Sequence, residues 1–431
     1  MSLHALLPAF RRRFPLVQRL RLLALASALL LFFPSASAQQ LPELDSIKML
    51  LTDPTIEMEA TFGIDNMYNF QFNVAESQFR WLKVKYEQHP LPNFLLGLSQ
   101  WWKMMPNVDQ TQYDLLFLTY MDSTIYYAEQ LLEEPETAVE GHFFLAASHA
   151  FKSRLYAERE KWRKAAVSGK KSLKHLDECR NKDYLSPELL FGDGLYNYYA
   201  EWIPDNYPAL KPILLFFPKG NKDKGLEQLK EVTQEAFYTR VEAFLYLMRI
   251  YAIEEKENAK AFRISEYLHE TYPKNAYFHR FYARMLFTTG RSRSELRATT
   301  EEILRRIDRG QTGYEETSGR YATYYLAYIH RLKQHNDTAV HYFKRTVEFA
   351  ESIQAYGSGY YLSSCNALAK YYKKEGDLAK AKEYYDKVLE HADKKKSYYD
   401  EAKSFKKAFR KYERGKRREE RRQRRLERKG N

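Results

Sequence analysis

Histidine is the residue of this chain with the widest chemical range, because a neutral imidazole binds metals and titrates near neutral pH. The chain has 11 histidines and no His-Glu-x-x-His sequence. His142 and His149 are seven residues apart, which places both on one face of a helix but about 10 Å apart along its axis. That is too far for two ligands of one ion. We expect histidines that pack or face solvent, and we predict no metal site.

Phosphate-binding and nucleophile motifs are not found in the sequence. Gly192-Asp193-Gly194 has neither a third glycine nor a preceding strand pattern, so it does not predict a dinucleotide site. Gly357-Ser358-Gly359 lacks the Gly-x-Ser-x-Gly spacing of a nucleophile elbow and is typical of a link between two helices. The acidic residues lie beside lysines, as in Glu-x-x-x-Lys pairs on helix surfaces. We therefore expect a protein that is not an enzyme and has no cofactor.

The two cysteines, Cys179 and Cys365, are too few for a disulfide scaffold or a cysteine-rich zinc module. One interpretation is that both cysteines are buried free thiols. A bridge between them is the other, since the sequence does not show how far apart they lie.

Aromatic residues are abundant, with 35 Tyr, 26 Phe and 5 Trp. Many occur as adjacent pairs, such as Tyr324-Tyr325, Tyr360-Tyr361 and Tyr371-Tyr372. Adjacent helical residues point about 100° apart. One ring of a pair can therefore fill the core while its neighbour faces solvent or a groove. Packing explains most of these rings, and a groove lined with tyrosines would suit an extended peptide or a glycan.

The first 38 residues have the order of a secretory signal peptide. Five arginines precede the apolar run Leu22 to Phe33, and Ala36-Ser37-Ala38 provides a small-residue cleavage site. The run has 12 residues, fewer than the ~20 that span a bilayer. We expect cleavage near Ala38 and an exported protein, periplasmic or secreted; an uncleaved anchor is the alternative.

The remaining chain reads as one amphipathic helix after another, with apolar residues recurring at intervals of three and four. Between 362 and 390, small residues stand at Ala369 and Ala381, large ones at Tyr372 and Tyr385, and Gly376-Asp377 supplies a turn. The preceding unit repeats this spacing with Ala327, Ala339 and Phe343.

This pattern resembles the tetratricopeptide repeat (TPR), a helix-turn-helix unit of about 34 residues. The resemblance is specific over about 240–395 and looser nearer the N-terminus. It implies an all-α, right-handed solenoid of about seven to nine helical pairs, which binds a partner protein or peptide in its concave groove.

The segment 191–225 interrupts the repeats with four prolines, Pro204, Pro208, Pro212 and Pro218, which we expect to end any long helix. It also carries several aromatic side chains that could fold over a groove. The sequence therefore offers a candidate binding set for a partner or a glycan: Tyr196, Tyr199, Trp202, Phe216 and Phe217.

The formal charge of +13 is concentrated at the two ends, since residues 1–38 carry +5 and 394–431 carry +12, which leaves −4 for the rest. A mildly acidic body argues against a globular nucleic-acid-binding domain, and we expect no nucleic-acid partner in vivo. The basic end is a solvated helix or disordered, or it attaches to an anionic membrane or envelope surface. The candidate attachment residues are Arg417, Arg418, Arg421, Arg422, Arg424 and Arg425.

These observations predict a signal peptide (1–38), degenerate repeats (39–240), regular TPR-like repeats (241–395), a capping helix (396–413) and a polybasic tail (414–431). They favour a non-enzymatic scaffold or adaptor of the bacterial cell envelope. The alternative is a module that binds a glycan or small ligand through the aromatic segment 191–225.

Overall fold

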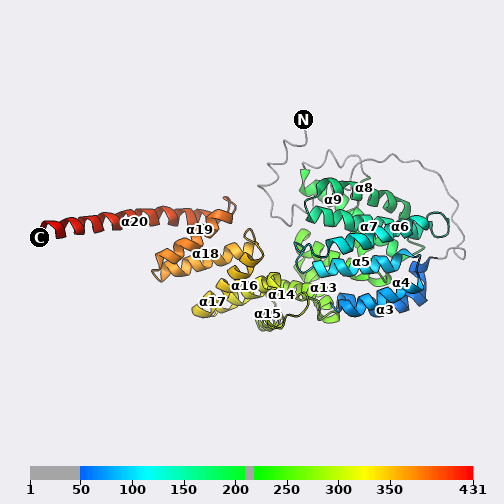
Figure 1. Cartoon of the computed structure of the whole chain (residues 1–431), viewed down its shortest axis with the longest axis horizontal. Coiled ribbons are helices and arrows are strands. Elements are labelled where there is room, and N and C mark those ends of the chain that lie inside the picture. Colours follow the sequence, from blue (N-terminus) through cyan, green and yellow to red (C-terminus); the bar gives the residue numbers. More distant parts are fainter. Residues whose placement is uncertain (1–48, 209–217, 431) are drawn as a thin grey trace, which may run out of the picture. The chain divides into compact units, whose positions relative to one another are not determined.

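The computed structural model describes residues 49–208 and 218–430, and all regular structure within these ranges is helical (Figure 1). The helices form two compact units, one ending at Met285 and one beginning at Leu286. We call them unit 1 and unit 2. The predicted signal peptide, residues 1–38, lies outside the described residues.

Unit 1 begins with a short 3-10 turn, η3 (Leu50–Thr52), and has a second, η4 (Pro187–Leu189), before α9. A π-helical turn, η6 (Ile250–Glu254), follows α12. Its α-helices are α3 (Pro54–Tyr68), α4 (Phe72–Lys85), α5 (Pro90–Met104), α6 (Asp114–Gln130), α7 (Ala138–Glu158), α8 (Trp162–Cys179), α9 (Leu190–Asn206), α11 (Lys222–Glu235), α12 (Arg240–Arg249), α13 (Asn258–Thr271) and most of α14 (Ala276–Thr289).

Unit 2 contains the end of α14 and six further helices. They are α15 (Arg293–Asp308), α16 (Glu316–Leu332), α17 (Asn336–Ser352), α18 (Gly359–Lys374), α19 (Leu378–His391) and α20 (Ser397–Gly430).

Helices that follow one another in the chain pack together in pairs, as α3 does on α4, α5 on α6, α7 on α8, α9 on α11, α12 on α13, α16 on α17 and α18 on α19. Successive pairs also touch, for example α17 on α18. This all-helical array of consecutive contacts confirms the coarser part of the predicted fold class. It is the packing that an α-solenoid requires.

Short side chains lie where paired helices cross. Ala369 of α18 and Ala381 of α19 are fully buried in one apolar cluster, which also holds Ala327 of α16 and Ala339 of α17. Between α18 and α19, Gly376 adopts a φ of +81°, which favours glycine. The Asp377 side chain then caps α19 by accepting from the Lys380 amide at 3.0 Å. Local sequence thus sets both the turn and the close approach.

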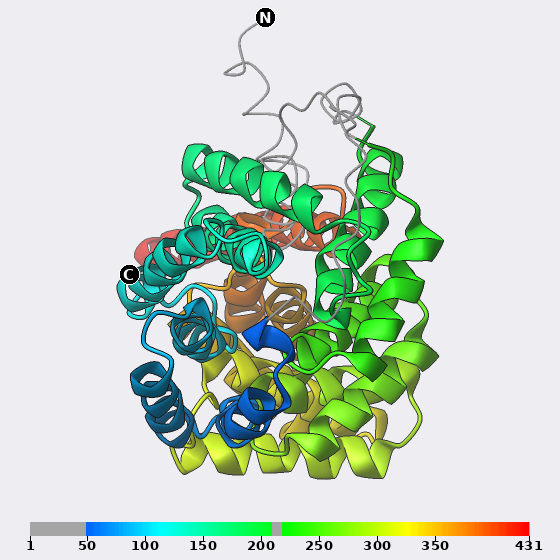
Figure 2. The ribbon, with the colours of Figure 1, turned by 90° about the vertical axis from the view of Figure 1, so that its right-hand side faces the viewer.

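Unit 1 adds contacts between helices that are far apart in the chain. Asn275, before α14, donates to the Tyr68 carbonyl oxygen at the end of α3 at 2.8 Å. The Trp102 indole of α5 donates to Glu242 of α12 at 2.9 Å. Every residue of α5 except Lys103 is buried. Figure 2 shows the helices of unit 1 following one another around its centre, so that the first (blue) and last (green) lie side by side.

The prolines of the segment 191–225 and the boundary at 413/414 can be placed on the described helices. Helix α9 continues for two residues beyond Pro204 and ends at Asn206, before Pro208. Helix α20 runs unbroken from Ser397 to Gly430, so the predicted capping helix and the predicted polybasic tail are parts of one helix. Glycine at 415 does not interrupt it.

Candidate binding surfaces

The paired tyrosines of unit 2 divide between core and surface. In four of the five pairs the second ring is buried and the first is partly exposed, whereas both rings of Tyr398-Tyr399 are partly exposed. The buried rings are Tyr325, Tyr361, Tyr372 and Tyr385, and their partly exposed neighbours are Tyr324, Tyr360, Tyr371 and Tyr384. This is the arrangement that the 100° step between adjacent helical residues predicts. Unit 2 therefore shows a row of tyrosines to solvent.

Five partly exposed aromatic rings of unit 2 form one continuous patch, which we call the tyrosine face: Phe287, Tyr321, Tyr324, Tyr328 and Tyr360. The Tyr360 ring lies 5.0 Å from Tyr321 and 4.5 Å from Tyr324, measured between centroids. Phe287 meets the Tyr328 ring at 5.1 Å, edge to face. Beneath them the hydroxyls of Tyr360 and the buried Tyr325 are 2.9 Å apart. Rings held by one another in this way are pre-organised for contact with a ligand.

Cationic side chains continue the surface beyond Tyr328. The Arg331 guanidinium lies 5.4 Å from the Tyr328 ring centroid and 5.7 Å from that of Phe343. Arg331, Lys370 and Lys374 line a shallow hollow of about 250 Å³ between α17 and α18. An aromatic patch bordered by cations would complement a segment with apolar and acidic residues.

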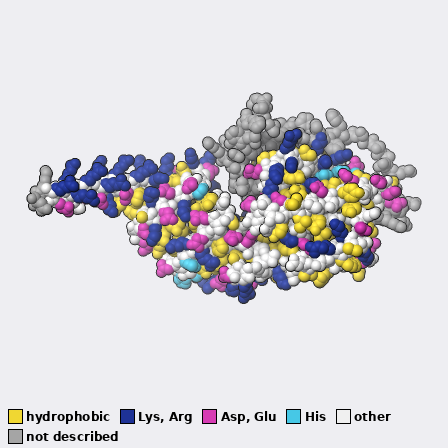
Figure 3. Space-filling view, viewed as in Figure 1, with side chains coloured by type: hydrophobic (Ala, Val, Ile, Leu, Met, Phe, Trp, Pro, Cys, Tyr) yellow, Lys and Arg dark blue, Asp and Glu magenta, His cyan; other side chains and the backbone are white. Residues whose placement is uncertain are grey.

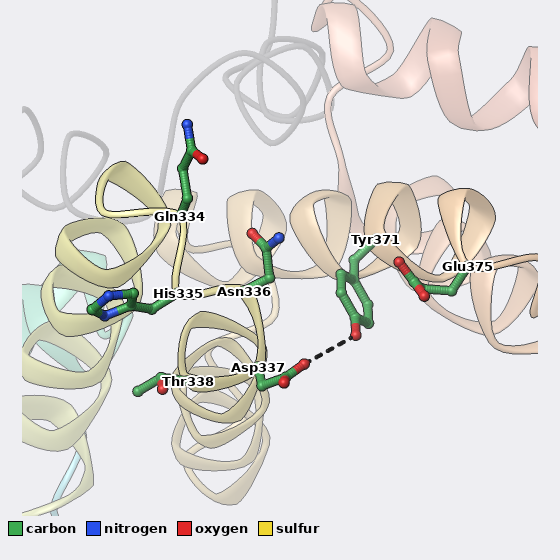
Figure 4. A pocket seen from close by; sticks show the side chains of 7 residues that line it. All are labelled: Gln334, His335, Asn336, Asp337, Thr338, Tyr371 and Glu375. Atoms are coloured by element: carbon green, nitrogen blue, oxygen red, sulfur yellow. Dashed lines mark hydrogen bonds between the residues drawn. The ribbon is translucent and has the colours of Figure 1, made fainter.

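A second hollow of about 460 Å³ adjoins the first, and the two share Asn336, Tyr371 and Glu375. Figure 4 shows Tyr371 and Asp337 pointing toward one another, whereas Gln334 points away from both. The Tyr371 hydroxyl donates to Asp337 Oδ1 at 3.4 Å. Partial burial and the nearby carboxylates Glu375 and Asp337 raise the pKa of Tyr371. The hollow is therefore lined by hydrogen-bonding groups and is acidic near Tyr371.

Two aromatic pairs of unit 1 are covered by the chain itself, whereas Tyr126 of the pair Tyr126-Tyr127 is 60% exposed. Phe143 and Phe144 are both buried, and so are Tyr198 and Tyr199. Tyr198 donates from its hydroxyl to Glu255 Oε1 at 2.6 Å. Burial of both rings distinguishes these two pairs from the four pairs of unit 2 described above.

Buried glutamates join distant parts of unit 1. Glu188 accepts hydrogen bonds from the amides of Phe237, Tyr238 and Thr239, at 2.6 to 2.8 Å, and caps the start of α12. Glu140 accepts from the Leu51 amide at 2.6 Å. Burial raises the pKa of Glu188, and the hydrogen bonds from Thr239 and its neighbours oppose that shift. The sequence places Glu140 in the first turn of α7 and Glu188 in η4. It does not show the distant main-chain amides that donate to these two side chains.

The residues predicted from the segment 191–225 fall into three groups. Tyr196 and Trp202 are partly exposed on α9; the Tyr196 hydroxyl donates to the Pro218 carbonyl oxygen at 2.7 Å, and Arg180 lies 4.4 Å from its ring centroid. Tyr199 is only 8% exposed, so it packs within unit 1 instead of lining a surface. Phe216 and Phe217 lie outside the described residues.

The six predicted attachment residues, Arg417, Arg418, Arg421, Arg422, Arg424 and Arg425, are all exposed on α20. This part of α20 is helical, which agrees with the expectation of a solvated helix and not with that of a disordered end.

His175 of α8 lies beside both His142 and His149 of α7. The spacing of these histidines along the sequence does not show that they are close. The Nδ1 atoms of His142 and His175 are 2.9 Å apart, and the His149 and His175 rings stack at 6.2 Å. Burial lowers the pKa of His149 to about 3 and that of His175 to about 4. Among the residues that the structure describes, no group of three or more His, Cys, Asp or Glu side chains is placed to hold a metal ion.

Cys179 and Cys365 are both buried and free, one in each unit. Burial raises the pKa of each thiol to about 12. The described helices include none with the length and apolar character to span a bilayer. No protein-family model matches the sequence, and neither does any curated protein.

Proposed function

We propose that this chain is a non-enzymatic scaffold that holds a partner protein or peptide on the tyrosine face of unit 2. In this proposal the helix pairs are TPR-like repeats in a right-handed solenoid. The protein acts in the bacterial cell envelope, exported by the N-terminal segment and released by cleavage near Ala38. The buried alanines at the crossings of α16/α17 and α18/α19 support the repeat assignment.

The observation that carries the proposal is the division of the tyrosine pairs. Tyr325 and Tyr361 are buried in the core, whereas Tyr324 and Tyr360 are partly exposed, with their ring centroids 4.5 Å apart. Rigid amphipathic rings lose little conformational entropy on binding. Arg331 lies against Tyr328 at the edge of the tyrosine face, so the face suits an extended segment that carries apolar residues followed by acidic ones.

Site-specific photocrosslinking in the native envelope, followed by mass spectrometry, tests the proposal. A photoreactive amino acid at Tyr324 or Tyr360 is expected to capture one common protein. The same group at Tyr267, which is 44% exposed in unit 1, is the matched control and should not capture it. The purified partner should then bind the wild type and lose affinity for the Tyr324→Ala/Tyr360→Ala variant. Equal capture from all three positions would contradict the proposal.

The alternative is a glycan or small-ligand site on α9, favoured by the partly exposed Tyr196 and Trp202 and by Arg180 stacked on Tyr196. Deleting 191–225 would not test it, because Tyr198 and Ile203 of that segment are buried in unit 1. The variant Tyr196→Ala/Trp202→Ala removes the exposed rings alone. Under this alternative it abolishes binding on a glycan array, whereas under the scaffold proposal it leaves partner capture from Tyr324 unchanged.

A further inference from the structure

The basic residues of α20 are arranged on one side of the helix. Successive residues of a helix are ~100° apart, so six of the arginines fall within an arc of about 100°. We call these the arginine stripe: Arg414, Arg417, Arg418, Arg421, Arg425 and Arg428. All six are exposed, and Figure 3 shows Lys and Arg side chains (dark blue) gathered along one edge of the helix.

The opposite side of the same helix carries mainly acidic and neutral side chains, with Lys416 as its cation. Glu419, Glu420 and Glu427 lie on it, together with Gln423 and a single large apolar side chain, Leu426. An amphipathic helix that inserts into a bilayer needs a continuous apolar face. This part of α20 has none, so its chemistry suits contact with a charged surface and not insertion into it.

The first half of α20 fixes the direction in which the stripe points. Phe405 packs on Tyr385 of α19 with ring centroids 4.7 Å apart, and the Tyr385 hydroxyl donates to Glu401 at 3.2 Å. Lys406 donates to Asp386 at 2.7 Å. Exposed Lys403, Lys407 and Arg410 lie on the side away from Phe405 and Glu401 and extend the stripe toward α19. The cationic line from Lys403 to Arg428 is therefore straight and about 37 Å long at 1.5 Å per residue.

We propose that α20 lies lengthwise on an anionic phospholipid bilayer with the arginine stripe against the headgroups and the glutamate side facing away. A flat surface meets every side chain of a straight stripe at once. Arginine is also the residue whose planar guanidinium pairs with phosphate oxygens in a bidentate way. The stripe has no Asn, Gln or aromatic side chain of the kind that reads or stacks on bases, which favours a lipid over a nucleic acid. This surface is separate from the tyrosine face, so either proposal can fail without the other.

Co-sedimentation of the full chain with vesicles at low salt tests the inference. The wild type should bind vesicles of equal parts phosphatidylcholine and phosphatidylglycerol, and should not bind phosphatidylcholine alone. Each cation is worth about fivefold in partitioning, so Arg421→Gln/Arg425→Gln/Arg428→Gln should lower the partition coefficient about a hundredfold. Added salt should release the wild type.

A second variant separates a one-sided stripe from net charge. Arg421→Glu/Glu419→Arg/Arg425→Glu/Glu427→Arg exchanges residues two positions apart, which lie on opposite sides of a helix. Composition, net charge and helix propensity are kept, and circular dichroism confirms that the helix remains. This variant should lose binding to anionic vesicles as the glutamine variant does. Wild-type binding by the exchanged variant, wild-type binding to phosphatidylcholine alone, or tighter binding to duplex DNA than to anionic vesicles would overturn the inference.

Discussion

The side-chain amide of Asn275 donates a hydrogen bond to the main-chain carbonyl oxygen of Tyr68 at 2.8 Å, although 207 residues separate them in the chain. The Oδ1 atom of the same side chain accepts from the amides of Tyr277 and Phe278 at 3.0 and 3.1 Å, and so caps α14. Asn275 is fully buried. One side chain thus starts a helix and joins it to the first helix pair of unit 1.

Replacing Asn275 by alanine should destabilise unit 1 by about 2–3 kcal/mol, because it removes a helix cap and leaves a buried carbonyl oxygen without its donor. The loss is measurable by urea denaturation, and faster hydrogen exchange should appear in both α3 and α14. Ser292→Ala is the matched control. Ser292 caps α15 through the Glu295 amide and is partly exposed, so its loss should cost only about 1 kcal/mol. Equal losses in the two variants would contradict the bridging role.

The sequence was sufficient to predict the helical class and the helix pairs, because small residues such as Ala369 and Ala381 leave a periodic signal where helices cross. It also predicted that adjacent tyrosines separate into core and surface, as Tyr325 and Tyr324 do. The same reasoning misplaced Tyr199. Both Tyr198 and Tyr199 of α9 are buried, so α9 packs against other parts of unit 1 on more than one side. The residues next to Tyr199 in the sequence do not indicate this additional packing.

Contacts that depend on distant segments could not be predicted. Glu188 caps a helix that begins about 50 residues later, and Asn275 reaches back to α3; neither leaves a repeat or a motif. The hollow beside Asn336 and Tyr371 is likewise formed by the geometry of two helix pairs. The regular spacing that predicts the helix pairs does not indicate where their surface is hollowed.

Gly225 of α11 allows that helix to approach α9 closely, and its replacement tests this crossing. A Cβ atom at 225 would lie 2.5 Å from the Tyr198 amide nitrogen and 2.6 Å from the Gly194 carbonyl oxygen. Both obstacles are main-chain atoms, so the helices must separate, and Gly225→Ala should destabilise unit 1 by about 2–3 kcal/mol. Gly415→Ala is the control, since nothing lies within 4 Å of its added Cβ. In an exposed helix that change should stabilise α20 by up to about 1 kcal/mol. Thermal unfolding and circular dichroism measure both effects.

The small residues at the helix crossing of α18 and α19 give an equivalent test in unit 2. Ala369 is fully buried, whereas Ala379 is exposed on α19. Ala369→Leu should force the two helices apart and cost about 1–3 kcal/mol. Ala379→Leu adds the same atoms to the surface and should change the free energy of unfolding by less than about 0.5 kcal/mol. Denaturant titrations measure the free energy of unfolding of both variants. Similar values would show that a larger side chain at 369 does not disturb the crossing of α18 and α19.

Acid should destabilise unit 1 through His149. Its side chain is 6% exposed, Nδ1 has no hydrogen-bond partner within the described residues, and Lys171, Lys152 and His175 lie nearby. Burial is the main reason that its pKa falls from 6.5 to about 3. The unfolded chain therefore takes up the proton first as the pH drops. Stability should be lost below pH 6.5 at about 1 kcal/mol per pH unit, and the loss should level off near the folded-state pKa. His149→Phe keeps the ring and removes the titration, so the difference between the wild-type and variant unfolding free energies should change by this amount from pH 6 to pH 5. A difference that does not vary with pH would show that His149 is already protonated in the folded chain.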